Sequence, residues 1–452
     1  MPRYTFEEGT SSKFWQIELD GSTFTVVYGK IGTAGQSQTK SFGSDAEANK
    51  EYDKLIKEKT KKGYVLDGTG EATPVPSPKV AAPKPGGNPE IEAAIAANPE
   101  DANAYLVYAD WLQSQNDKLG EYVALAVRGA TDPALKKMAA RMLKENTKAW
   151  VGMLAEEPEL ATLRWANGFI QTASVTMEYE GEPHARKILG ALLKLPTARF
   201  LQALTLGLYY DEEETYEVNY SGAARLLVAN GALPTLRALF IGSFEYPDET
   251  EISWAKLGNL GKLWALYPNL EHLHLRGGEQ KLGELNLPNL KSFLLETGGL
   301  DVGALKSISK ASWPNIERIS VWIGRDDYGW NGKPADILPL LQRKDLPKLK
   351  HLGIKNNELG DVIAEMVVGS PLVAQVEELD LSMSTLGDPG AEVLIRNAAK
   401  LVHLKLLDVT DCYISDPVAA RLKAALPNAS VDGQREPDEY GGELHRYSSV
   451  GE

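Results

Sequence analysis

The chain has 452 residues, which at about 150 residues per domain indicates about three domains. Its 43% hydrophobic and 24% charged content predicts folded domains and excludes a disordered chain. The formal net charge of -14 excludes a protein that coats nucleic acid along its whole length, and the single cysteine, Cys412, excludes an intramolecular disulfide and a zinc site with two or more cysteine ligands.

Residues 1–68 show a strand pattern that ends in a helix. Apolar side chains alternate up to Asp20-Gly21, a dipeptide typical of a tight turn, and a second strand is expected over 23–31. A glycine-rich turn then precedes a third strand over 36–42. These segments are expected to form a small antiparallel sheet.

A helix pattern follows from Ser44. Its hydroxyl and Glu47 three residues later form the two halves of a capping box, and Gly63 is a helix-ending residue. The apolar residues between them fall on one helix face: Ala48, Tyr52, Leu55 and Ile56. One helix is therefore expected to pack across the sheet, which gives a small α+β domain over 1–68.

Two segments connect this domain to the rest of the chain. Six prolines in residues 69–89 favour extended polyproline-like structure, which predicts a proline-rich linker over 69–88. Residues 89–157 carry apolar side chains at helical spacing, interrupted at Asn98-Pro99. This segment is expected to be a helical module that caps the N-terminal end of the next domain.

A repeated pattern dominates residues 158–432. Two apolar residues three positions apart, followed by a third two positions later, occur eight times at intervals of 20 to 35 residues. Five of the eight follow a Pro-polar pair, a turn that leads the chain into a strand. The period predicts a solenoid of parallel strands with helical backs, followed by a tail over 433–452. The patterns begin at Leu201, Leu236, Leu270, Leu290, Ile316, Leu349, Val376 and Leu404.

These repeats resemble leucine-rich repeats. Residues 355–359 (Lys-Asn-Asn-Glu-Leu) and 410–414 (Thr-Asp-Cys-Tyr-Ile) fit the Asn/Cys-x-Leu continuation of that family. The resemblance implies an α/β leucine-rich-repeat solenoid with parallel strands. Its concave sheet is expected to bind a protein partner.

The first 65 or so residues resemble a WGR domain, through residues 13–21, residues 28–36 and the helix over 47–62. WGR domains are similar to a module of DNA-dependent poly(ADP-ribose) polymerases in which the Trp-Gly-Arg turn grips a DNA strand end. The triplet here is Tyr28-Gly29-Lys30, which keeps an aromatic face and replaces a planar guanidinium by an ammonium. Residues 89–128 resemble a helical module that accompanies repeats in bacterial proteins. The chain is thus identified as a multidomain bacterial WGR and leucine-rich-repeat protein.

The WGR resemblance implies that the first domain binds DNA or RNA. The residues expected to contact it are Tyr28, Lys13, Lys30 and Lys40. However, residues 1–68 hold ten basic and ten acidic residues, whereas nucleic-acid-binding domains usually carry a net positive charge. The neutral charge favours the alternative, a purely protein-protein scaffold, and the sequence leaves both alternatives open.

Side chains between the apolar anchors of each repeat are expected on the concave face, because strand residues alternate. Aromatic residues and arginines among them have the composition of protein-interface anchors. Long loops that cover these residues are the alternative to exposure. The concave-face residues predicted to bind protein are Phe240, His274, Arg276, Leu294, Arg318, Trp322 and Lys355.

The sequence lacks recognisable motifs for catalysis, cofactor binding or metal binding. His272 and His274 lie two residues apart on one strand without an identifiable third ligand, so no metal site is expected. The chain contains no G-x-S-x-G, H-E-x-x-H, phosphate-binding loop or Rossmann glycine set. We therefore expect a non-enzymatic adaptor without catalytic residues or cofactors.

Localisation is predicted from two further features. No run of about 18 apolar residues occurs. The first eight residues lack the basic and then apolar segments of a signal peptide. Both features predict a cytoplasmic protein without a membrane partner.

Overall fold

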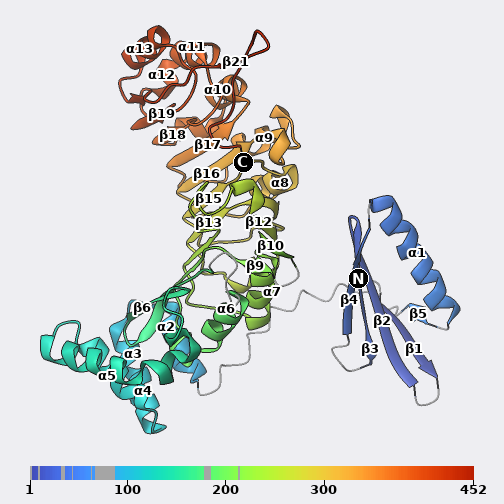
Figure 1. Cartoon of the computed structure of the whole chain (residues 1–452), viewed down its shortest axis with the longest axis vertical. Coiled ribbons are helices and arrows are strands. Elements are labelled where there is room, and N and C mark those ends of the chain that lie inside the picture. Colours follow the sequence, from blue (N-terminus) through green and yellow to red (C-terminus); the bar gives the residue numbers. More distant parts are fainter. Residues whose placement is uncertain are drawn as a thin grey trace. The chain divides into compact units, whose positions relative to one another are not determined.

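The chain forms two compact units, Met1–Ser77 and Pro78–Glu452, each with its own hydrophobic core. The linker predicted over 69–88 lies outside the described residues except for 87 and 88. The computed structural model (Figure 1) describes residues 3–8, 11–31, 36–42, 44–62, 64–66, 87–177, 185–211 and 214–451.

The first unit is an antiparallel sheet with the strand order β4-β3-β2-β1-β5 and one helix, α1, on one face (Figure 1). The three predicted strands and the helix are confirmed. The sequence analysis missed β1, which has only two apolar residues, and the outer strand β5, which is only two residues long. The elements are β1 (Arg3–Glu8), β2 (Ser11–Asp20), β3 (Thr23–Lys30), β4 (Gln36–Ser41), α1 (Asp45–Lys61) and β5 (Val65–Leu66).

Helix α1 begins and packs as its sequence predicts. The Ser44 hydroxyl accepts a hydrogen bond of 3.3 Å from the Glu47 amide, which satisfies one free donor of the first turn. Ala48 is fully buried, and the apolar side chains after it pack on a core of strand residues. That core consists of Tyr4, Trp15, Ile17 and Phe24.

The second unit starts with the predicted helical module. Four helices each begin at an Asn or Asp whose side chain accepts a hydrogen bond from the first turn. The predicted interruption at Asn98-Pro99 separates the first two. The elements are α2 (Pro89–Ala97), α3 (Ala102–Ser114), α4 (Lys118–Arg128), α5 (Pro133–Val151) and the 3-10 helix η1 (Gly152–Ala155).

A buried ion pair joins this module to the repeats. Arg199 donates a hydrogen bond of 2.6 Å to the Glu92 carboxylate and also contacts the Tyr108 hydroxyl. The Arg199 side chain is only 4% exposed. A buried charge of this kind needs its partner, so the contact fixes the module against the first repeat.

The repeats form one 11-stranded sheet in which every neighbouring pair is parallel except β6–β7. The predicted parallel solenoid strands are confirmed, and all eight patterns lie on them or lead into them. The sequence analysis missed β6, β7 and β20, which extend the sheet at its two ends. The strands are β6 (Ala161–Ala166), β7 (Phe169–Val175), β8 (Ala203–Leu206), β11 (Ala238–Ile241), β13 (His272–Arg276), β15 (Ser292–Glu296), β16 (Arg318–Gly324), β17 (His351–Asn357), β18 (Glu378–Asp380), β19 (Leu406–Asp408) and β20 (Ala429–Ser430).

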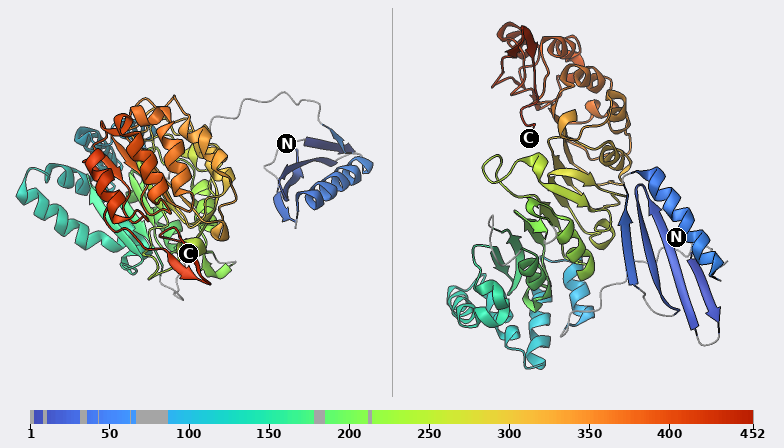
Figure 2. Two further views of the ribbon diagram at one scale, coloured as in Figure 1. Left: turned by 90° about the horizontal axis from the view of Figure 1, so that it is seen from above. Right: turned by 45° about the vertical axis from the view of Figure 1, so that its right-hand side comes forward.

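Helices and short 3-10 turns follow the strands and stack along the solenoid, as Figure 2 shows for the orange and red repeats. Their apolar faces and the strand anchors share one continuous core. The helices are α6 (Ala185–Lys194), α7 (Ser221–Asn230), α8 (Val302–Lys310), α9 (Pro334–Leu341), α10 (Gly360–Val368), α11 (Asp388–Arg396), α12 (Ala398–Leu401) and α13 (Asp416–Ala425).

Smaller elements complete the second unit. The 3-10 turns are η2 (Pro196–Ala198), η3 (Ile252–Trp254), η4 (Trp264–Leu266), η5 (Asp326–Tyr328) and η6 (Pro371–Ala374). Two-stranded sheets are β9 (Tyr210–Asp211) with β10 (Glu214–Val218), β12 (Lys256–Asn259) with β14 (Gly278–Lys281), and β21 (Asp438–Tyr440) with β22 (Glu443–His445). Within the described ranges, no helix has the length and apolar content needed to cross a bilayer.

The Pro-Asn pairs before the strands link each repeat to the one before it. The side-chain amide of Asn269 donates to the Pro234 carbonyl at 2.9 Å, and that of Asn289 donates to the Pro268 carbonyl at 3.1 Å. Asn315 repeats the contact with Pro288 at 2.8 Å. These hydrogen bonds satisfy carbonyls that have left the sheet ladder, and they hold successive turns in register.

Candidate functional site

The strand register places the residues between the apolar anchors in two rows. Each member of a row pairs with its neighbour on the next strand. The first row is Ala203, Ala238, His272, Ser292, Arg318, His351, Glu378 and Leu406. The second row is Thr205, Phe240, His274, Leu294, Ser320, Gly353, Asp380 and Asp408.

Arg276 lies at the centre of an aromatic cluster near the ends of these strands. Its guanidinium is 5.6 Å from the ring centre of Phe240, 5.6 Å from that of Phe244 and 5.9 Å from that of Tyr246. It also donates to the Phe244 carbonyl and, at 2.5 Å, to the Glu296 carboxylate. Because Phe244 and Tyr246 follow β11, Arg276 fastens the loop of residues 242–251 onto the sheet.

Trp322 is covered by this loop. It is only 7% exposed, and the Tyr246 ring packs against it edge-to-face at 6.4 Å. The prediction that Trp322 is an exposed interface anchor is therefore wrong. The physical reason is the alternative noted from the sequence, since an insertion after a strand folds back over the concave face.

The part of the concave face that stays accessible is smaller than the sequence predicts. His272 is exposed, and the side chains of Arg318 and Glu378 are 43% and 41% exposed with their charged atoms 3.8 Å apart. Phe240 and His274 are half-buried and stack in parallel at 3.8 Å. Together with half-buried Leu294, these residues form an amphipathic surface, which we call the concave patch.

Glu296 is ionised beneath this surface. Burial opposes its ionisation, but His274, whose Nε2 lies 3.2 Å away, and the charge of Arg276 together hold the pKa of Glu296 below its ordinary value. The Glu296 carboxylate therefore holds two of the predicted site residues, His274 and Arg276, in position.

Two further contacts join polar side chains of β17 and β18. Lys355 lies 2.9 Å from Asp380, and His351 Nδ1 lies 2.9 Å from Glu378. Burial lowers the pKa of His351 more strongly than Glu378 raises it, so the imidazole is neutral at pH 7. Lys355 is thus engaged within the sheet, and only 20% of its side chain is exposed.

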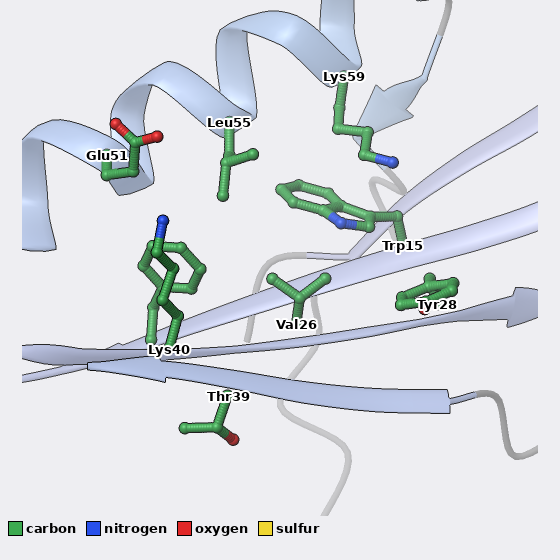
Figure 3. Close-up of a pocket in the computed structure, with 9 residues that line it drawn as sticks. Trp15, Val26, Tyr28, Thr39, Lys40, Glu51, Leu55 and Lys59 are labelled. Atoms are coloured by element: carbon green, nitrogen blue, oxygen red, sulfur yellow. The ribbon is translucent and has the colours of Figure 1, made fainter. Parts of the chain in front are cut away.

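The first unit carries a cavity of about 600 Å³ between helix α1 and strands β3 and β4 (Figure 3). Tyr28 stands at its edge and is 42% exposed. Trp15 forms the floor and is almost fully buried. Figure 3 shows Glu51, Leu55 and Lys59 descending from the helix toward Trp15, Val26 and Tyr28 on the sheet.

Lys59 is a cavity residue that the sequence analysis did not include in the predicted nucleic-acid site. Its ammonium lies 5.5 Å from the Trp15 ring centre and 5.2 Å from that of Tyr64. Burial lowers its pKa, and Lys62 and Lys13 lower it further. A signal exists in the sequence, because Lys59 follows Leu55 by four residues and so lies on the apolar face of α1.

Only some of the residues predicted to contact nucleic acid line the cavity. Lys40 lines the cavity, and its ammonium lies 5.0 Å from the Phe42 ring centre. Lys13 is exposed and pairs with Lys30 in the register of β2 and β3, two residues beyond the Trp15–Tyr28 pair. The side chain of Lys30 lies outside the described residues.

Sequence reasoning also missed a ladder of alternating charge at the start of the solenoid strands. The residue after the first anchor of seven successive repeats alternates in sign, and neighbours form ion pairs: Lys291 with Glu271 at 2.5 Å, Lys350 with Glu317 at 2.9 Å and Lys405 with Glu377 at 2.6 Å. These charges neutralise one another. The ladder is Arg237, Glu271, Lys291, Glu317, Lys350, Glu377 and Lys405.

Metal ligands do not gather in the part of the chain that the structure describes. No group of three or more His, Cys, Asp or Glu side chains there has the arrangement to hold an ion. The His274 ring stacks on Phe240 and lies beside the Glu296 carboxylate, whereas His272 is exposed. Cys412 is buried, which raises the pKa of its thiol and makes the reactive thiolate scarce.

Comparison with known families agrees with both resemblances. Residues 3–71 match the model of the WGR domain, and residues 376–394 match that of a leucine-rich repeat. The chain therefore has a WGR domain at its N-terminal end and leucine-rich repeats in its C-terminal part.

Two Escherichia coli proteins resemble the first unit. The uncharacterized protein YfeS is 43% identical and the protein YehF 46% identical over 65 residues. These residues are 14% of this chain and cover 27% of YfeS and 24% of YehF. The chain thus matches about a quarter of the length of each relative.

A crystal structure of a Bacteroides fragilis protein resembles the whole chain, with 24% identity, a TM-score of 0.52 and 99% of each chain covered. This likeness concerns the fold alone. An internalin from Listeria monocytogenes covers 58% of this chain and 86% of its own, at 17% identity and a TM-score of 0.23.

Proposed function

We propose that the protein is a non-enzymatic adaptor in which the WGR domain binds nucleic acid and the leucine-rich-repeat solenoid binds a protein. Each interface is built by one unit with its own core, so the two can act separately. The WGR and leucine-rich-repeat matches support modules for nucleic-acid binding and protein interaction. The residues themselves supply the chemistry of each interface.

The open cavity of the WGR domain carries the nucleic-acid half of the proposal. Tyr28 offers a free aromatic face for stacking on a base or sugar, and Lys40 and Lys59 offer two cations to a phosphate backbone. A volume of about 600 Å³ lies within the range of ligand sites. This site compensates locally for the neutral charge of the domain.

Fluorescence anisotropy tests this half. Labelled nicked, blunt-ended and single-stranded DNA are titrated with the full chain at several salt concentrations. We expect salt-sensitive binding that weakens about tenfold in Tyr28→Ala and in Lys59→Ala, since a stacked base contributes about 1–3 kcal/mol. Lys57→Ala is the matched control, because Lys57 is exposed on the same helix outside the Tyr28 cavity.

The concave patch carries the protein half. Arg318, Glu378 and His272 lie in the row beside the half-buried Leu294 and Phe240, so polar and apolar side chains adjoin as they do at the edge of a protein interface. We expect Arg318→Ala and Leu294→Ala to weaken partner binding by about 1–2 kcal/mol each. Lys350→Ala, a change of charge in the ladder, serves as control and should bind normally.

A purely protein-protein scaffold is the second candidate. The ten acidic residues that balance the ten basic ones in residues 1–68 favour it. Absence of DNA binding by the full chain at about 50 mM salt, where phosphate contacts are strong, would select it. The concave-patch variants would still weaken protein binding in that case.

A further inference from the structure

The last residues of the chain turn back along the solenoid. From the final repeat, residues 446–451 run across the carboxyl ends of strands β19 to β16, and Figure 1 places the C label beside β16 and β17, away from α13. Val450 contacts Asn356, and the Gly451 carbonyl lies against Gly298. We call residues 446–451 the tail segment.

Side chains of the solenoid recognise the backbone of this segment. Asn356 accepts a hydrogen bond of 2.8 Å from the Val450 amide and donates one of 2.7 Å to the Val450 carbonyl. The Tyr413 hydroxyl does the same for the amide and carbonyl of Tyr447, at 3.0 and 3.1 Å. Paired recognition of one residue's amide and carbonyl is how peptide-binding proteins hold an extended ligand.

The solenoid positions these contacts with an uncommon backbone conformation. Asn356, Met383 and Asp411 occupy the same place in three successive repeats, two residues after the last anchor, and each has a positive φ of 45°, 64° and 56°. Non-glycine residues rarely adopt this region. All three hold the tail segment, because the Met383 carbonyl accepts from the Ser449 amide at 3.0 Å and Asp411 accepts from the Ser449 hydroxyl.

Side chains of the tail segment fit distinct subsites. The Tyr447 ring lies under the Arg325 guanidinium at 5.0 Å, and Val450, 8% exposed, enters the hydrophobic core. A Cβ at Gly451 would lie 3.1 Å from the Tyr328 ring and 3.2 Å from the Arg325 side chain, so the smallest residue fits best there. The subsites favour an aromatic residue at position 447, a hydroxyl residue two positions later, and then valine and glycine.

The hairpin just before the tail segment is exposed. Strands β21 and β22 pair only with each other among the described residues, and Tyr440 and Leu444 on them are 81% and 70% exposed. A cavity of about 440 Å³ remains between this hairpin and the solenoid, lined by Pro437 and Leu444 on one side and by Glu358, Asp361 and Thr385 on the other. The tail segment is therefore held by its own subsites and by Arg435, which donates a hydrogen bond of 2.8 Å to the Tyr447 carbonyl.

We propose that the carboxyl ends of strands β16 to β19 form a peptide-binding groove, separate from the concave patch, with the tail segment as its resident ligand. The groove takes an extended segment of a partner protein with the pattern aromatic-Ser-Ser-Val-Gly. Such a segment makes the same backbone hydrogen bonds and displaces the tail. The chain thereby couples partner binding to release of its own end.

A labelled peptide with the sequence of residues 446–452 tests the groove. We expect a chain ending at residue 445 to bind it saturably, and the full chain to bind at least about tenfold more weakly, because the tethered segment competes at a high effective concentration. In the shortened chain, Asn356→Gly keeps the backbone conformation and removes both hydrogen bonds. It should weaken peptide binding at least about tenfold.

Two results would overturn the proposal. One is a folded shortened chain that does not bind the peptide. The other is binding that Asn356→Gly leaves unchanged. If the shortened chain fails to fold, Val450→Glu in the full chain expels the segment by placing a charge in the core, and it should bind the peptide. Unfolding of that variant too would show that the segment is an integral part of the fold.

Discussion

Aromatic side chains on the sheets of the two units differ in their exposure to solvent. In the WGR domain Tyr28 is 42% exposed at an open cavity, whereas in the solenoid Trp322 is 7% exposed under a loop. Both residues occupy strand positions that the register predicts to be accessible. The difference teaches that an insertion after a strand, here residues 242–251, decides exposure as much as the strand pattern does.

The cations of the two units also differ in their partners, and Arg276 combines an ion pair with three ring contacts. In the solenoid, Arg276, Lys355 and the ladder lysines are paired with carboxylates of neighbouring strands. In the WGR domain, Lys40 and Lys59 lie against aromatic rings at the cavity. A cation on a ring keeps more of its charge for a ligand than one in an ion pair, so the WGR cavity is the better site for an anion.

Core substitutions should break the two units separately, with the largest effect of all. Phe293→Ala in the solenoid core should lower its free energy of unfolding by about 3–5 kcal/mol and leave the WGR transition unchanged. Trp15→Ala should do the reverse. Calorimetry of the full chain resolves the two transitions, and a shared shift in either variant would contradict their independence.

Loss of Arg276 should uncover the solenoid's aromatic residues. Arg276→Ala leaves Glu296 partly buried beside His274 alone, and we expect a loss of about 3 kcal/mol. Hydrogen exchange should rise in residues 242–251. Arg276→Lys keeps the charge but not the planar stacking, so its effect should be intermediate. Unchanged exchange in the loop would show that Arg276 does not fasten it.

Acid should weaken the solenoid through His351. Its folded-state pKa lies below the ordinary value of 6.5, so the unfolded chain binds the proton more readily and stability falls as pH drops below about 6.5. The groups facing it are Glu378, Arg318 and Asp380. His351→Gln should flatten the fall in denaturation midpoint between pH 7 and 5, and an unchanged slope would count against this assignment.

The charge ladder should give the smallest effect. Lys350 pairs with Glu317 at 2.9 Å on the open surface, where solvent and salt screen the attraction. Lys350→Ala should leave the denaturation midpoint at its parent value. A clear loss of stability would mean that the ladder fixes the repeat register.

Much of the fold could be predicted from sequence. Eight apolar patterns defined the concave rows with the correct register, because strand side chains alternate and each repeat begins at the same turn. The small domain was predicted from its turn and capping residues. Strands β5 and β20 were missed because each is a two-residue strand at a sheet edge, and β1 was missed because it has only two apolar residues.

The sites were harder to predict, since they depend on contacts between distant segments. Trp322 was misjudged because nothing local shows that Tyr246, 76 positions earlier, lies on it. Lys59 was missed because a lysine at a helix end usually faces solvent, and only the packing of α1 on Trp15 brings it to the cavity. The alternating ladder was also missed, although its charges follow the first anchor of each repeat and could have been found from the sequence.

Hydrogen exchange of the full chain with and without a nicked DNA duplex tests directly whether the WGR cavity binds nucleic acid. We expect protection in β3 and in α1 around Leu55 and Lys59, with strands β11 to β16 unchanged. Protection confined to the solenoid strands, or none at about 50 mM salt, would contradict it.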